Sequence, residues 1–109
     1  MSPWVDVCAV DDLTPNRGVA ALFGGRQVAV FLVEPGDEVL AIDNLDPCSG
    51  AAVLSRGIVG SKGDVLTVAS PVFKQRFDLR TGACLDDPEV AVTSYATRVV
   101  DGTVQVATP

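Results

Sequence analysis

Histidine is absent from this 109-residue chain. Its absence excludes Ser-His-Asp triads, Cys-His nucleophile pairs, H-E-x-x-H zinc sites and histidine-ligated haem, because each of these needs an imidazole. The chain also lacks the phosphate-binding motifs G-x-x-x-x-G-K-[ST] and G-x-G-x-x-G. An independent active site would have to use carboxylates or a lone cysteine, and we expect no catalytic residue here.

Cysteine is scarce as well. Cys8, Cys48 and Cys84 are odd in number and have no C-x-x-C spacing, so neither a disulfide framework nor a structural zinc site is indicated. We expect Cys8 and Cys84 to be small apolar residues in or near strands. The N-terminus has no signal-peptide pattern, and no apolar run is long enough to span a bilayer. These features predict a reducing, cytoplasmic location.

Basic residues are outnumbered by acidic ones, 8 to 14, which gives a net charge of -6 and a pI of about 4.3. This balance would repel phosphate backbones and anionic membranes, so we expect neither nucleic acid nor membrane as a partner. The acidic run at residues 86–89 (D-D-P-E) lacks the ligand spacing of a calcium loop and predicts a solvated turn. The length and the 48% of hydrophobic residues predict a single packed domain over residues 1–109.

Long amphipathic helices are missing, and β-branched segments bounded by turn residues recur along the chain. We predict strands near residues 4–8, 18–23, 26–33, 38–43, 65–69, 77–79, 93–100 and 103–107. Turns are predicted at 24–25, 35–37, 62–64, 81–82 and 101–102, with 24–25 and 101–102 as the best hairpin candidates. The pattern predicts a small all-β sandwich or barrel, in which residues 43–65 form the longest segment without a clear strand.

Two segments carry a more specific pattern. Residues 71–82 read P-V-F-K-Q-R-F-D-L-R-T-G and residues 54–57 read L-S-R-G. The former resembles the second box of Rieske iron–sulfur proteins, C-P-x-H-G-x-x-F-D-x-x-T-G. The latter resembles the L-S-x-G that follows their first box, C-P-H. The resemblance implies a Rieske-like antiparallel β sandwich or barrel whose two box loops meet at one tip.

The resemblance also shows which ligands are missing. A Rieske centre holds one iron with two cysteines and the other with two histidines. In the second box, Ser70 stands at the cysteine position, Phe73 at the histidine position and Lys74 at that of the neighbouring glycine. In the first box, either Pro47 and Ser49 or, one residue earlier, Asp46 and Cys48 occupy the cysteine and histidine positions. Neither register retains a ligand pair.

Residues 46–60 and 69–82, followed by C-L-D-D-P at 84–88, resemble the small subunit of assimilatory NADH-dependent nitrite reductases. This resemblance implies a cluster-free accessory subunit of an oxidoreductase. Its partner would be a large subunit with FAD, an iron–sulfur cluster and sirohaem, which reduces nitrite to ammonium in the cytoplasm. Two alternatives stay open: a ligand-less ferredoxin-like component of another oxygenase or reductase, and an unusual cluster or metal held by Cys48 with Asp46 or Cys84.

A Rieske-like fold would bring several basic residues to the tip, which suggests a docking surface for the large subunit. These candidates are Arg56, Lys74, Arg76 and Arg80. Alternatively, Arg56 or Arg76 pairs with Asp46 and links the two loops. Phe73 either fills the space of the missing cluster or stands exposed as an aromatic anchor. We favour packing, because the chain has few aromatic residues.

Overall fold

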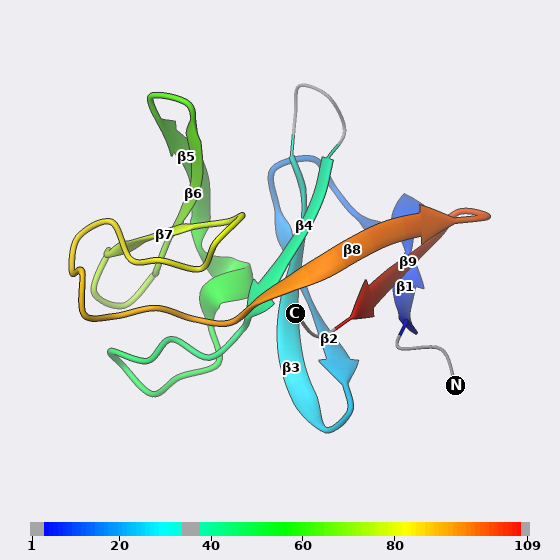
Figure 1. Cartoon of the computed structure of the whole chain (residues 1–109), viewed down its shortest axis with the longest axis horizontal. Helices are drawn as coiled ribbons and strands as arrows, with labels where there is room; N and C mark the ends of the chain where they lie inside the picture. Colours follow the sequence, from blue (N-terminus) through cyan, green and yellow to red (C-terminus); the bar gives the residue numbers. More distant parts are fainter. Residues whose placement is uncertain (1–3, 34–37, 108–109) are drawn as a thin grey trace.

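The computed structural model describes residues 4–33 and 38–107, so the turn predicted at 35–37 lies outside the described residues. Nine strands and two short 3-10 turns make up the described structure (Figure 1). The strands are β1 (Val5–Ala9), β2 (Gly18–Phe23), β3 (Arg26–Val33), β4 (Glu38–Asp43), β5 (Ile58–Lys62), β6 (Val65–Ala69), β7 (Arg76–Asp78), β8 (Ser94–Val100) and β9 (Thr103–Ala107). The 3-10 turns are η1 (Val10–Asp12) and η2 (Leu54–Arg56). The all-β prediction is confirmed.

Six strands form one antiparallel sheet in the order β1-β9-β8-β4-β3-β2. Its two outer strands, β1 and β2, contact each other, so the sheet curls into a nearly closed barrel. The remaining strands form a small sheet in the order β5-β6-β7. Figure 1 shows this small sheet beside the barrel, with the helical turn η2 between them.

Strand β3 explains how one hydrophobic run serves both parts of the fold. Its side chains alternate between two faces, as in any strand. Val28 and Val30 point into the barrel core, together with Tyr95. Ala29, Phe31 and Val33 point to the opposite face, where they join a second core. A strand buried on both faces needs a continuous apolar sequence, which V-A-V-F-L-V supplies.

The second core fastens the small sheet to the barrel. It combines the outer face of β3 and β4 with Leu54 of η2, Val68 of β6, and Phe77 and Leu79 around β7. Phe77 is 0% and Leu79 1% exposed. Cys84 is buried in the same cluster and Cys8 packs against the barrel core, so both fill the apolar role that the sequence predicts.

The two best hairpin candidates are confirmed. Gly24 and Gly25 have φ of 56° and 84°, and Asp101 and Gly102 have φ of 51° and 78°. Two consecutive positive φ values are the signature of the type I′ turns that match strand twist.

Strand β5 was missed by the sequence prediction, which left residues 43–65 without a strand. Four of its five residues are exposed and within the described residues it pairs only with β6, so it has neither an alternating nor a continuous apolar pattern. The turn predicted at 62–64 just before β6 was the available signal, because Gly63 with φ of 61° closes the β5–β6 hairpin.

Candidate functional site

The two motif segments form neighbouring loops, one after β4 and one between β6 and β7 (Figure 1). In the first, the Asp46 N–H donates to the Ala51 carbonyl and the Gly50 N–H to the Asp46 carbonyl. In the second, the Ser70 N–H donates to the Gln75 carbonyl and the Lys74 N–H to the Ser70 carbonyl. The loops share one hydrogen-bond pattern. We call them the box-1 loop (46–51) and the box-2 loop (70–75).

The first residues of the two loops also use their side chains alike. The Asp46 carboxylate accepts from the N–H two residues on, at 2.9 Å, and the Ser70 hydroxyl accepts from the Val72 N–H at 3.2 Å. Asp46 and Ser70 therefore hold equivalent places. This equivalence favours the register in which Asp46 stands at the first-box cysteine position.

Asp46 is fully buried and joins the loops. Its carboxylate accepts from the Ser70 hydroxyl at 2.6 Å, the Ser49 hydroxyl at 3.0 Å and the Gln75 amide at 3.3 Å. Burial by itself raises the pKa of Asp46. The hydrogen bonds from Ser70, Cys48 and Ser49 outweigh that effect and lower the pKa below its ordinary value, because they favour the ionised form.

The alternative that Arg56 or Arg76 pairs with Asp46 is wrong. Among residues 4–33 and 38–107 the carboxylate has no cationic partner, and Arg76 instead binds Asp86. The loops are linked, but through hydroxyl and amide donors. Gln75 was not among the candidates, since a polar uncharged residue in a loop gives no distinctive sequence signal. Ser49 was named only as a possible histidine position of the first box, and it donates to Asp46 instead.

The residues at these positions do not fit a Rieske cluster. Of Asp46, Cys48, Ser70 and Phe73, only Cys48 offers a thiol, and a benzyl side chain cannot bind iron. Both Asp46 oxygens are already engaged by loop donors. In the described part of the chain no three His, Cys, Asp or Glu side chains gather to hold a metal, and buried Cys84 and exposed Cys48 belong to no such group.

Phe73 overturns the favoured expectation that it packs inside. It is 63% exposed, and its neighbour Val72 is 45% exposed. The buried side chains of Asp46 and Ser70, which are hydrogen-bonded to each other, lie between the loops in place of the ring. The outer face of the box-2 loop is therefore apolar.

Lys74 follows directly on that apolar face. Its φ is 68°, the left-handed region that costs a non-glycine residue about 1–2 kcal/mol. In the box-1 loop the equivalent residue is Gly50, with φ of 75°. The side chain of Lys74 is exposed and has no hydrogen bond or ion pair within residues 4–33 and 38–107.

The other two basic residues near the second box are ion-paired. Arg76 binds Asp86 with an N–O distance of 2.8 Å, and Arg80 binds Glu38. The Arg76 guanidinium and backbone N–H lower the pKa of Asp86 to about 2. The segment 86–89 is an exposed turn, as predicted, in which Asp87 also accepts from the Glu89 N–H at 3.0 Å.

Gly57 explains why the L-S-R-G motif ends in glycine. A Cβ at this position would lie 2.3 Å from the Ala69 carbonyl oxygen and 2.7 Å from a Val68 methyl group. The chain after the box-1 loop therefore lies directly against the end of β6, one residue before the box-2 loop. This contact holds the segment that follows the box-1 loop against the segment that precedes the box-2 loop.

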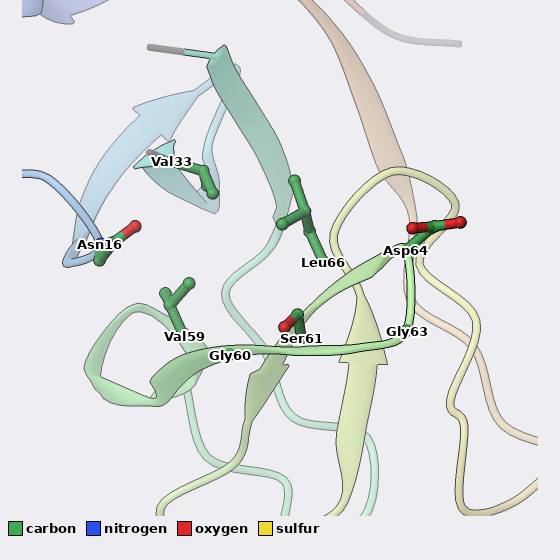
Figure 2. A pocket seen from close by; sticks show the side chains of 8 residues that line it. All are labelled: Asn16, Val33, Val59, Gly60, Ser61, Gly63, Asp64 and Leu66. Atoms are coloured by element: carbon green, nitrogen blue, oxygen red, sulfur yellow. The ribbon is translucent and has the colours of Figure 1, made fainter. Parts of the chain in front are cut away.

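A hollow of about 400 Å³ lies at the junction of the two sheets (Figure 2). Val33 lines it from β3, and Val59 and Leu66 line it from the β5–β6 hairpin. Asn16, Ser61 and Asp64 supply polar groups, and none of the described residues that line the hollow is basic. None of the predicted site residues lines this hollow.

A model of the Rieske-like [2Fe-2S] domain matches residues 3–107, so the chain belongs to the Rieske-like domain family. It is 48% identical over 106 residues to the nitrite reductase (NADH) small subunit of Salmonella typhimurium, covering 97% of this chain and 98% of that one. A crystal structure from Mycobacterium tuberculosis, provisionally described as an NADH-dependent nitrite reductase small subunit, has a TM-score of 0.92 and 50% identity over 97% of this chain and 95% of that one. Within the Rieske-like family, the chain belongs to the nitrite reductase small subunits, which are oxidoreductase subunits.

Two further relatives bear on partners. A region of the nitrite reductase [NAD(P)H] large subunit of Klebsiella oxytoca is 43% identical over 104 residues, which cover 95% of this chain and 11% of that protein. The anthranilate 1,2-dioxygenase ferredoxin subunit of Burkholderia cepacia is 36% identical over 109 residues, covering 97% of this chain and 93% of that one. Among the described residues, no helix has the length and apolar character needed to cross a membrane.

Proposed function

We propose that this chain binds the large subunit of a cytoplasmic, NADH-dependent nitrite reductase and supports its assembly or activity. The observation that carries this proposal is the match to the Klebsiella oxytoca large subunit, in which a homologous region is part of the large-subunit polypeptide itself. A region that is covalently joined in one protein is a natural non-covalent partner in another. By resemblance, the FAD, iron–sulfur cluster and sirohaem that reduce nitrite to ammonium belong to the large subunit.

We also propose that the chain contributes no redox centre of its own. The support is the donor set, since the candidate ligand positions hold a hydroxyl, a benzyl ring, a single exposed thiol and a carboxylate that is occupied by loop donors. The cross-link between Asp46 and Ser70 would then do the structural work of the cluster, which in a Rieske protein ties the two loops together.

The proposed docking surface is the outer face of the box-2 loop, together with the neighbouring basic residues. Phe73 is a large exposed ring, and aromatic anchors dominate many protein interfaces. Lys74 keeps a charged side chain at a backbone position that favours glycine, and such strain is typical of functional positions. Arg76 and Arg80 are partly neutralised by their own carboxylate partners. Lys74 is therefore the strongest charged candidate, with Arg56 as an additional one.

The test is NADH-dependent nitrite reduction by the purified large subunit with and without this chain, alongside size-exclusion chromatography of the mixture. Co-elution with a change in activity would support the accessory-subunit proposal. Separate elution with unchanged activity would contradict it.

The similarity to the anthranilate dioxygenase ferredoxin subunit supports a second candidate, a ferredoxin-like component of an oxygenase. Its identity is lower than that to the nitrite reductase small subunits, 36% against 48%. Visible absorbance and stoichiometric iron in anaerobically purified protein would favour this candidate, because a ferredoxin must carry an electron.

A further inference from the structure

A second hollow lies where the start of β2 meets η2, and its lining shares no residue with the pocket of Figure 2. Its volume is about 320 Å³, and it is lined by Arg17, Gly18, Ser55, Arg56 and Gly57. None of these five residues is acidic, although acidic residues outnumber basic ones in the chain. The hollow therefore gathers positive charge on a protein whose net charge is -6.

Arg17 and Arg56 differ from most other arginines of the chain. Arg26, Arg76 and Arg80 are paired with carboxylates. Within residues 4–33 and 38–107, Arg17 and Arg56 form neither an ion pair nor a side-chain hydrogen bond, and both are exposed. The N–H donors of both guanidinium groups are therefore available to a ligand in this hollow.

The walls of this hollow are fixed by close packing. A Cβ on Gly18 would lie 2.4 Å from the Ser55 carbonyl oxygen and 2.6 Å from the Phe31 ring. The Gly57 position is equally tight against Ala69. Because Gly18 has no side chain, β2 packs closely against η2. Because Gly57 has none, the residue after η2 packs closely against β6. These two contacts hold the backbones of Arg17 and Arg56 in a fixed arrangement.

We propose that this hollow, the Arg17–Arg56 site, binds a small oxyanion, that is, a carboxylate or phosphate group. The planar guanidinium matches both groups through paired N–H donors, and two guanidiniums surround such a group better than one. The Ser55 hydroxyl, which makes no hydrogen bond within the described residues, adds a neutral donor to the lining. The acidic remainder of the surface disfavours a nucleic acid or an anionic membrane as the source of the anion.

The bound oxyanion could belong to either of two molecules with the same chemical group: a free small molecule, or the large subunit through an acidic side chain. The first arm of the test titrates the full chain with inorganic phosphate and with succinate at constant ionic strength, followed by ¹H–¹⁵N NMR. We expect saturable shifts of the amides of residues 17–18 and 55–57. In Arg17→Gln with Arg56→Gln the affinity should fall by about tenfold or more, since each charge-assisted contact is strong.

The matched control removes two positive charges elsewhere, with Lys62→Gln and Arg98→Gln, and should leave the affinity within about twofold of wild type because both lie outside the lining. The variant Arg17→Lys with Arg56→Lys keeps the charge but loses the paired donors, and should fall between wild type and the glutamine pair. Unchanged amide spectra away from the site verify that each variant is folded.

The second arm measures binding of the large subunit by wild type, the glutamine pair and the control pair, with and without added phosphate. Only this arm rests on the proposed function. If the wild-type chain does not bind the large subunit, the anion titrations of the first arm alone decide whether the site binds an oxyanion. Large-subunit binding that the glutamine pair weakens and phosphate inhibits identifies an acidic side chain of the partner as the source. Saturable anion binding without an effect on the partner identifies a free anion. The proposal is overturned if neither phosphate, succinate nor large-subunit binding depends on the two arginines more than on the control pair.

Discussion

The Ser70 hydroxyl donates a hydrogen bond to the Asp46 carboxylate across an O–O distance of 2.6 Å, between residues that are 24 positions apart in the chain. Both side chains are fully buried. The two loops share one backbone hydrogen-bond pattern, and this bond joins the first residue of one to the first residue of the other. It therefore links the loops at structurally equivalent positions.

Removing the charge of Asp46 should destabilise the fold. In Asp46→Asn the amide nitrogen would face donors from Ser49, Ser70 or Gln75, and one of them would lose its acceptor. We expect a loss of about 1.5–3 kcal/mol in the free energy of unfolding, measured by urea denaturation. The control is Asp101→Asn, an exposed hairpin-turn position that tolerates asparagine. Equal stability of the two variants would contradict the cross-link.

The Asp46 carboxylate should make the free energy of unfolding depend on pH in the acidic range. The folded-state pKa of Asp46 is lower than its ordinary value of 3.8, so its contribution is fully present above the unfolded pKa. That contribution is lost as the pH falls below about 4 and through the folded pKa. The stability difference between wild type and Asp46→Asn should be constant from pH 7 to 5 and shrink below pH 4. A difference that stays the same at pH 3 would refute a depressed pKa.

A methyl group on Gly57 should disrupt the contact between the two motifs. Its Cβ would meet backbone and side-chain atoms of β6 at 2.3 and 2.7 Å. We expect Gly57→Ala to lower the free energy of unfolding by about 1–3 kcal/mol or more, as in other overpacked sites. In Gly60→Ala, three residues on in β5, the nearest atom is 3.7 Å away, so stability should change little. Similar losses in both variants would contradict the clash as the cause, because Gly→Ala lowers the entropy of the unfolded chain and by itself stabilises the fold.

Phe73 should anchor the large subunit. Replacing it by serine removes an exposed ring without opening a cavity, so the free chain should keep its stability. The dissociation constant for the large subunit should rise about tenfold or more, as for other aromatic anchors. Leu22→Ser is the matched control, because Leu22 is 70% exposed on β2, outside the two loops. Equal dissociation constants for the two variants, measured by calorimetry, would remove Phe73 from the interface.

Lys74 should show opposite effects on stability and on binding. Lys74→Gly relieves a left-handed φ of 68° and should raise the free energy of unfolding by about 1 kcal/mol. It also deletes the charge, so binding of the large subunit should weaken and become less sensitive to salt. Lys74→Ala keeps the strain and deletes the charge, which separates the two effects. If the glycine variant is no more stable than the alanine variant, the backbone is not strained there.

Patterns set by backbone periodicity were readable in the sequence. The apolar run of β3 and the glycines of the hairpin at residues 24–25 follow from alternation and turn chemistry. The motifs at 54–57 and 71–82 identified the family. The glycine that ends the first motif has a steric reason, because a Cβ at Gly57 would lie 2.3 Å from the Ala69 carbonyl oxygen.

Tertiary structure decided what depends on partners distant in the chain. The exposed β5 has no pattern of its own and is defined by its pairing with β6. The partner of Asp46 is a serine 24 residues away rather than an arginine, and Arg76 forms an ion pair with Asp86. Arg17 and Arg56 line one hollow because Gly18, which has no side chain, lets β2 pack closely against η2. Long-range contacts of this kind form only as the whole chain folds, so the sequence around each residue does not indicate its partner.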